Sequence, residues 1–200
     1  MKKAHARILV GAAAAVSALG LAVPSASAAT WTVSPANTAF TATQSGNLVM
    51  TSGSTTITCT AGKESGTTGD GSNAAALATL SNGSESGCTD SVAGGSWTVS
   101  LSGGSLAGSS YSNGVTTGTI NGMTAKASGS DFGLGCSFTA TGTLTATYTN
   151  SSATLKITGG TMTLSNVSGA GCGFAGIANG NTGSVTGAYV ASPAITVTAS

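Results

Sequence analysis

The feature that most constrains this chain is a regular alternation between apolar or small residues and threonine or serine. It is longest from Phe138 to Tyr148, where every second residue is Phe, Ala, Gly, Leu or Tyr and all the residues between them are threonine. Successive side chains of a β-strand point to opposite faces of its sheet, so this pattern predicts a strand with one buried and one wet face. Threonine suits the wet face because its β-branched side chain fits a pleated surface. The same alternation recurs at 55–61, 97–101, 123–128, 155–157, 162–164 and 195–197.

Glycine-rich turn signals separate these segments. The dipeptides typical of hairpins and loops are Asn113-Gly114, Asn121-Gly122, Asn179-Gly180, Gly94-Gly95, Gly103-Gly104 and Gly159-Gly160. Short strands at such spacing are typical of sandwiches and barrels. We therefore predict an all-β fold, an antiparallel β-sandwich or flattened barrel of about ten strands. Residues 62–72 and 82–90, which are rich in Gly and Ser, are predicted to be loops.

The N-terminus has the three-part pattern of a secretory signal peptide. Lys2, Lys3 and Arg7 precede an apolar run at 8–23, and small residues follow up to Ala28. The apolar run is shorter than the roughly 20 residues that a membrane-spanning helix needs. We expect residues 1–28 to be a signal peptide cleaved after Ala28, and residues 29–200 to be a single all-β secreted domain, extracellular and without a transmembrane segment.

Cleavage at this point changes the charge and the chemistry of the chain. The mature part carries three lysines against five acidic residues, a net charge of −2, and the only histidine, His5, and the only arginine, Arg7, leave with the signal peptide. Histidine-based catalytic sets such as Ser-His-Asp are thereby excluded. So few positive charges cannot offset many phosphates, which makes nucleic acid a poor partner. We expect no catalytic residue and no cofactor.

Four cysteines in an exported chain predict two disulfides. Three pairings are possible, and we favour sequential pairing because each bridge then closes one half of the chain. The favoured bridges are Cys59–Cys88 and Cys136–Cys172. Without histidine or a C-x-x-C motif, a zinc site is disfavoured.

Acidic residues gather in the two predicted loops, Glu64 and Asp70 in one and Glu85 and Asp90 in the other. A Cys59–Cys88 bridge would bring these loops together. Paired carboxylates could serve glycoside hydrolysis, and the oxygen-rich run 69–73 could join Glu85 and Asp90 around calcium. Neither pattern has the spacing or the aromatic neighbours that such sites usually have, so we expect flexible turns and no bound metal.

Several short motifs together resemble a family of small exported bacterial proteins. They are Ser34-Pro35-Ala36-Asn37-Thr38-Ala39-Phe40-Thr41-Ala42, Gly46-Asn47-Leu48, Ile57-Thr58-Cys59-Thr60-Ala61, Cys88, Ser96-Trp97-Thr98-Val99, Cys136, Gly171-Cys172 and Ser192-Pro193-Ala194-Ile195-Thr196-Val197-Thr198. Their order is similar to that of the alkane-oxidation activator family and related secreted proteins of unknown function from actinomycetes. The resemblance implies an extracellular, cysteine-paired β-protein without enzymatic activity that acts on hydrophobic growth substrates at the cell surface.

Two functions follow as expectations. The first is a non-enzymatic secreted or cell-envelope protein that binds an apolar small molecule or coats a surface. The candidate lining of an apolar site, if one exists, is the set of large aromatic side chains Trp97, Phe132, Phe138 and Phe174, for each of which the simpler expectation is a place in the core. The alternative is a structural or adhesive module that self-associates, or binds a protein or cell-surface component, through exposed strand edges that few charges guard.

Overall fold

The computed structural model describes residues 29–72 and 74–200, so the signal peptide predicted at 1–28 lies outside the described residues. Most of the described chain is β-strand. The strands are β1 (Trp31–Ser34), β2 (Ala39–Gln44), β3 (Leu48–Ser52), β4 (Thr55–Cys59), β5 (Ala61–Thr68), β6 (Ala78–Asp90), β7 (Ser96–Ser102), β8 (Ser105–Ser112), β9 (Val115–Asp131), β10 (Leu134–Thr149), β11 (Thr154–Ser168), β12 (Thr182–Ser192) and β13 (Thr196–Ala199). The described helices are the short η1 (Asn150–Ser152) and α1 (Gly171–Phe174), and neither has the length to cross a membrane.

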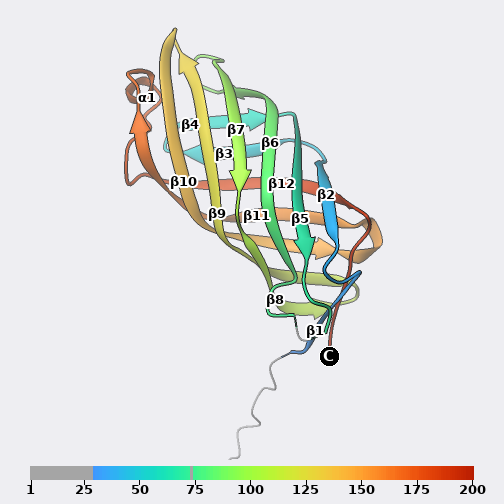
Figure 1. The fold of residues 1–200 in the computed structure, drawn as a ribbon. Helices are drawn as coiled ribbons and strands as arrows, with labels where there is room; N and C mark the ends of the chain where they lie inside the picture. Colours follow the sequence, from blue (N-terminus) through green and yellow to red (C-terminus); the bar gives the residue numbers. More distant parts are fainter. Residues whose placement is uncertain (1–28, 73) are drawn as a thin grey trace, which may run out of the picture.

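Eight antiparallel strands form a closed barrel. The hydrogen-bonded order runs β12–β2–β5–β6–β7–β9–β10–β11, and β11 pairs again with β12 to complete the ring. Figure 1 shows the flattened shape that results: β10, β9, β7 and β6 run along the long axis in front, while β3, β4, β11 and β12 cross behind them. Of the two predicted architectures, the flattened barrel is therefore correct and the open sandwich is not.

The remaining strands complete the wall. Two pairs of strands connect β12 to β6. One is the hairpin β3–β4, and the other is the pair β2–β5. Strand β8 pairs with β6 and β9 at the opposite end. Each of the 11 strands in this sheet thus has neighbours on both sides, and the separate two-stranded sheet β1–β13 holds the outer edges that remain in the described chain.

Two kinds of sequence signal were misread. Residues 62–72 and 82–90 are predicted to be loops, but 62–68 lie in β5 and 82–90 lie in β6, because glycine and serine there pair closely with neighbouring strands. Asn121-Gly122 and Gly159-Gly160 were expected to be turns but lie inside β9 and β11, where they coincide with shifts in strand register. Such bulges bend long strands, so they help the 17-residue β9 and 15-residue β11 to curve around the barrel.

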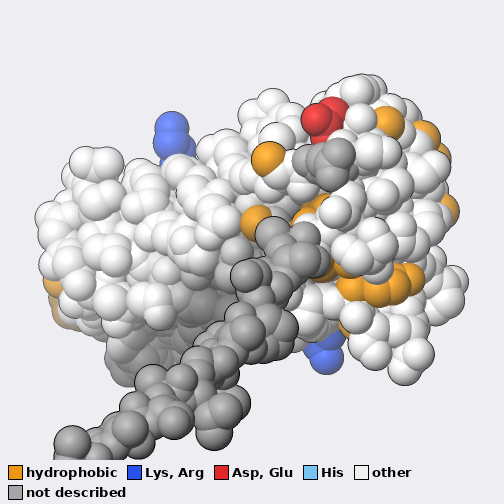
Figure 2. Space-filling view, turned by 90° about the horizontal axis from the view of Figure 1, so that it is seen from below, with side chains coloured by type: hydrophobic (Ala, Val, Ile, Leu, Met, Phe, Trp, Pro, Cys, Tyr) orange, Lys and Arg blue, Asp and Glu red, His pale blue; other side chains and the backbone are white. Residues whose placement is uncertain are grey.

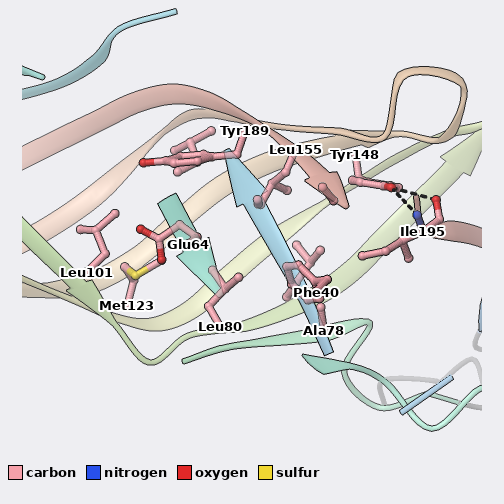
Figure 3. Close-up of a pocket in the computed structure, with 14 residues that line it drawn as sticks. Phe40, Glu64, Ala78, Leu80, Leu101, Met123, Tyr148, Leu155, Tyr189 and Ile195 are labelled. Atoms are coloured by element: carbon pink, nitrogen blue, oxygen red, sulfur yellow. Dashed lines mark hydrogen bonds between the residues drawn. The ribbon is translucent and has the colours of Figure 1, made fainter. Parts of the chain in front are cut away.

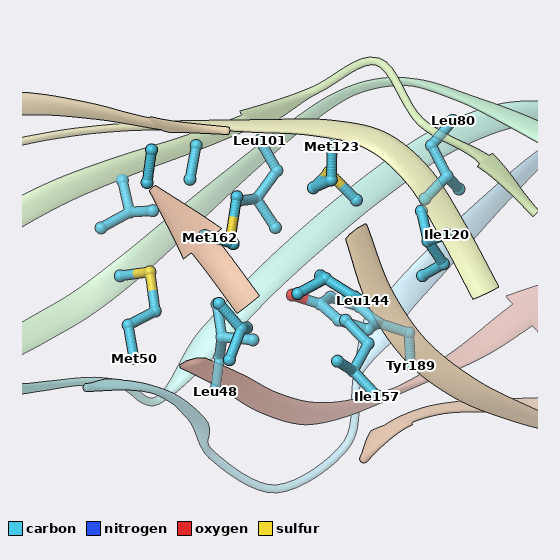
Figure 4. Packing of buried hydrophobic residues seen from close by; sticks show 14 of the residues in the cluster. Leu48, Met50, Leu80, Leu101, Ile120, Met123, Leu144, Ile157, Met162 and Tyr189 are labelled. Carbon is cyan, nitrogen blue, oxygen red and sulfur yellow. The ribbon is translucent and has the colours of Figure 1, made fainter. Parts of the chain in front are cut away.

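The predicted alternation does define the core. On β10, Phe138, Ala140, Leu144, Ala146 and Tyr148 are all buried, and their threonine neighbours face outward or are only partly covered. Opposing walls contribute Leu, Ile and Met side chains that meet in the middle of the barrel, as Figure 4 shows. The barrel therefore encloses a packed interior made largely of alanine and medium-sized aliphatic residues.

Bulky side chains of this interior lie directly over glycines of the adjacent strand. Trp97 pairs with Gly129 across β7 and β9, and a Cβ added at Gly129 would lie 2.3 Å from Cδ2 of the indole. Phe40 lies in the same way over Gly66. Glycine at these positions provides the room for the ring, because a narrow barrel has little free interior volume.

Both favoured disulfides are present. Cys59–Cys88 joins the end of β4 to β6, and Cys136–Cys172 joins β10 to α1. The bridged cysteines are 29 and 36 residues apart. Loops of this size contribute roughly 3–4 kcal/mol each in the chain-entropy model.

Replacing Gly129 by Ala should destabilise the protein by about 1–3 kcal/mol, since the new methyl group overpacks the buried indole of Trp97. Urea denaturation measures this change. The matched control is Gly135→Ala, because an added Cβ there has no atom within 4 Å. Equal stability of the two variants would contradict the close packing of Trp97 on Gly129.

Candidate functional site

The four aromatic residues predicted to line an apolar site separate into two pairs. Trp97 and Phe138 are buried in the core with ring centroids 5.9 Å apart. Phe132 and Phe174 are 69% and 62% exposed and contact each other edge to face at 6.0 Å. The structure thus does not gather the four around one cavity; it places one pair inside the barrel and the other on its surface.

The exposed pair forms, with Leu134, a surface cluster that we call the aromatic tip. Phe132 lies in the β9–β10 turn with a φ of 50°, a value that is rare for a bulky residue. Phe174 ends α1, which the Cys136–Cys172 bridge fastens beside this turn. Figure 1 shows α1 next to the upper ends of β9 and β10. Covalent fastening therefore keeps two large apolar side chains exposed together.

Two small cavities lie inside the barrel. One of about 40 Å³ is lined by Leu80, Leu101, Met123 and other apolar side chains together with Glu64, and the other, of about 30 Å³, lies near Met162. A cavity that accepts benzene measures roughly 150 Å³. Neither interior space, as it stands, could hold a hydrocarbon chain.

A pair of glutamates lies beside the larger cavity. Strands β5 and β6 each carry the motif Gly-x-Glu, as Gly62-Lys63-Glu64 and Gly83-Ser84-Glu85, and antiparallel pairing sets Glu64 opposite Gly83 and Glu85 opposite Gly62. Each carboxyl group covers the facing glycine so closely that an added Cβ would be 1.8 Å or less from a carboxyl oxygen. Both side chains are 5% exposed. Two reciprocal motifs therefore place two acids side by side inside the barrel.

Few polar groups form hydrogen bonds with this pair of glutamates. The phenol of Tyr189, itself 1% exposed, donates a hydrogen bond of 2.8 Å to Oε1 of Glu85. Figure 3 shows the Tyr189 ring and the Glu64 carboxyl group at the same end of the cavity as Leu101 and Met123. Oε1 of Glu64 and Oε2 of Glu85 are buried without a hydrogen-bond partner. The site thus supplies one donor to two carboxyl groups.

This surrounding favours the neutral acids. Burial, followed by the nearby charge of Glu85, raises the pKa of Glu64 to about 8. Burial also raises the pKa of Glu85, although the bond from Tyr189 acts in the opposite direction. Burial and the adjacent carboxylates raise the pKa of Tyr189 as well, so the phenol remains a donor. At neutral pH the two glutamates therefore hold at least one proton between them.

The other predicted acids do not join them. Asp70 is exposed, whereas Asp90 is buried, where it accepts hydrogen bonds from the amides of Val92 and Ala93 and from the indole of Trp97. These bonds shape the β6–β7 connection. No group of three or more His, Cys, Asp or Glu side chains that could hold a metal ion occurs among the described residues.

The sequence analysis anticipated that Glu64 and Glu85 would approach each other through the Cys59–Cys88 bridge, but it placed them in solvated loops. The signal that could have located them is the repeated Gly-x-Glu motif. Its glycines were interpreted as markers of flexibility, whereas they make room for the opposite side chain. Tyr189 was not expected at this site, because its contact depends on barrel closure between β12 and β2.

Fold and site together define a disulfide-linked, closed antiparallel β-barrel with an acid pair inside and an apolar tip outside. Over residues 1–199 the chain matches the family described as alkane oxidation protein activator PraA/PraB-like, and it belongs to that family. This confirms the resemblance found from the sequence motifs. Comparison with curated proteins and with solved structures found no match.

The buried pair should make the protein more stable in mild acid than in mild base. The pKa of Glu64 rises from 4.5 to about 8 on folding. The stabilisation that protonated Glu64 gives to the folded protein is therefore complete below pH 4.5 and is lost as the pH rises to 8. Between these values the unfolded chain releases a proton that the folded chain retains. The free energy of unfolding should fall by about 1.4 kcal/mol per pH unit in this window, measured by urea denaturation at a series of pH values.

The control is the double variant Glu64→Gln/Glu85→Gln, which preserves the shape but cannot ionise. Its stability should change little over the same window, since the only histidine lies in the predicted signal peptide. Wild-type stability that stays level or increases from mild acid to pH 8 would show that the pair is not held neutral.

Proposed function

We propose that this protein is a non-enzymatic exported barrel that adsorbs to apolar surfaces, such as a hydrocarbon phase at the cell exterior, through its aromatic tip. The observation that carries the proposal is the pair Phe132 and Phe174, the most exposed large apolar side chains of the described residues, on a weakly charged molecule. Membership of the PraA/PraB-like family supports a connection with alkane oxidation. The two disulfides are consistent with an extracellular location.

The tip has the properties that adsorption needs. Exposed aromatic rings lose contact with water when they enter an apolar phase, which stabilises the adsorbed state by roughly 1.5–3 kcal/mol for each fully buried side chain. Phe132, Leu134 and Phe174 are exposed on neighbouring segments, so one approach can bury all of them. The Cys136–Cys172 bridge limits the conformational freedom that would otherwise be lost on adsorption.

The remaining surface gives adsorption little opposition. In the view from below, Figure 2 shows mainly backbone and uncharged side chains, with isolated lysine and acidic groups. Lys63, Lys126 and Lys156 are exposed and far apart in the sequence. Weak charge reduces repulsion between adjacent adsorbed molecules, which favours a dense layer.

The interior of the barrel also favours adsorption at the surface over binding inside. Cavities of about 40 and 30 Å³ are too small for an alkane, so surface contact accounts for an apolar function better than enclosure does. The adhesive alternative requires exposed strand edges, and the described chain leaves only the short outer edges of β1 and β13, since all strands of the large sheet are paired on both sides. A carboxylate-based hydrolase would need its acids at an open cleft, whereas Glu64 and Glu85 are both buried.

The double variant Phe132→Ser/Phe174→Ser should adsorb at least about tenfold more weakly to a hexadecane–water interface, because most of the apolar area of the tip is removed. Pendant-drop tensiometry measures the protein concentration needed to lower the interfacial tension. Thermal unfolding should change little, since both rings are mainly exposed.

The matched control is Val190→Ser, which removes an apolar side chain that is 40% exposed but lies on β12. It should behave as the wild type does. Equal adsorption of the wild type and the tip variant would refute a role of the tip.

A further inference from the structure

At the level of the two glutamates, the seam between β5 and β6 has carboxyl groups on its inner side, and apolar contacts return farther along, where Leu80 pairs with Gly66 and Phe40 packs on that glycine. On its inner side the paired positions are Gly62 with Glu85 and Glu64 with Gly83. Gly66 continues the inner face of β5 after a shift in register. Besides the backbone hydrogen bonds, the interior contacts at this level are therefore those of the two carboxyl groups.

Among the residues that the structure describes, no positive charge faces the pair. From β12 comes the Tyr189 phenol, and from β2 comes the Gln44 amide, whose Nε2 donates to the carbonyl groups of Gly46 and Cys59 while its Oε1 is buried without a partner. From β7 come Val99 and Leu101, both apolar.

The remaining titratable neighbours lie elsewhere. Lys63, next to Glu64 on β5, and Lys126 on β9 are exposed on the outside. Farther along β6, Asp90 is engaged with the β6–β7 loop. The free oxygens around the pair thus belong to acceptors, and a second negative charge would have no partner.

We propose that the Glu64–Glu85 pair acts as a proton-dependent lock on the β5–β6 seam. The two strands stay together while the pair holds a proton, and they separate locally when that proton is released to solvent. Two adjacent carboxylates in an apolar interior repel each other and require water. The cavity that Glu64 lines with Leu80, Leu101 and Met123 adjoins the seam, so entering water would reach the core directly.

The geometry confines the opening. Cys59–Cys88 fastens β6 to the end of β4, just before β5 begins, so the strands cannot separate fully at this end. Strand β5 remains paired with β2 on its other side. The opened state is thus a local gap beside the glutamates, with the strongly paired β9–β10 region left intact.

Hydrogen exchange of the full protein between about pH 6 and pH 9.5, corrected for intrinsic rates, tests the lock. Between pH 6 and pH 8, protection of amides at 61–66 and 80–86 should fall at least about tenfold more than protection of amides in β9 and β10, which follows the global stability alone, and it should level off above pH 8. Nile red, a neutral apolar dye, should increase in fluorescence over the same range as the core becomes accessible.

The variant Glu64→Gln/Glu85→Gln should show neither change, since it has no proton to lose. If this variant does not fold, Tyr189→Phe provides a second test: it removes the hydrogen bond that stabilises ionised Glu85, so the opening should move to higher pH by about one unit. The proposal is overturned if the wild type stays closed up to pH 9.5, if all strands lose protection together, or if Tyr189→Phe leaves the transition in place.

Discussion

The structure depends on a steric complementarity: several of the bulky groups that enter the narrow barrel lie over a glycine on the next strand. Trp97 over Gly129 and Phe40 over Gly66 are apolar examples, and the Glu64 and Glu85 side chains use Gly83 and Gly62 in the same way. An eight-stranded barrel has an interior only wide enough for side chains to fill it, so every large residue needs a small neighbour. The many glycines and alanines of the chain are therefore part of the packing and do not indicate a loose fold.

The acid pair uses this packing for a different end. Two apolar side chains at the same positions would fill the same space at a lower cost in folding free energy, because burying carboxyl oxygens without hydrogen-bond partners is unfavourable. Their presence couples the wall of the barrel to proton concentration. The molecule thus has two regions of different chemistry, the exposed apolar aromatic tip and the buried acid pair, and the long strands of the barrel connect them.

Much of the fold was predictable, because alternation is a direct consequence of strand geometry. It located the buried faces of β7, β9 and β10, and the spacing of the four cysteines indicated the correct disulfides. Closure of the barrel was not predictable, since it depends on pairings such as Leu155 with Tyr189 that join distant segments. The same limit applies to the site. Glu64 and Glu85 could be recognised as a possible pair, but their burial follows only from closure. The threonine alternation indicates the burial of Phe138, but the pairing of the exposed Phe132 with Phe174 depends on the position of α1.

The short sheet β1–β13 has a practical consequence. Thr30 and Ser200 are joined by backbone hydrogen bonds, so the first and last described segments lie side by side. Figure 1 places them at the end of the molecule opposite α1. A molecule anchored by either segment would consequently stand upright, presenting its phenylalanines outward, as a bristle does on a brush. Orientation on a solid support, or on a cell wall, could then be chosen by the point of attachment without altering the barrel itself.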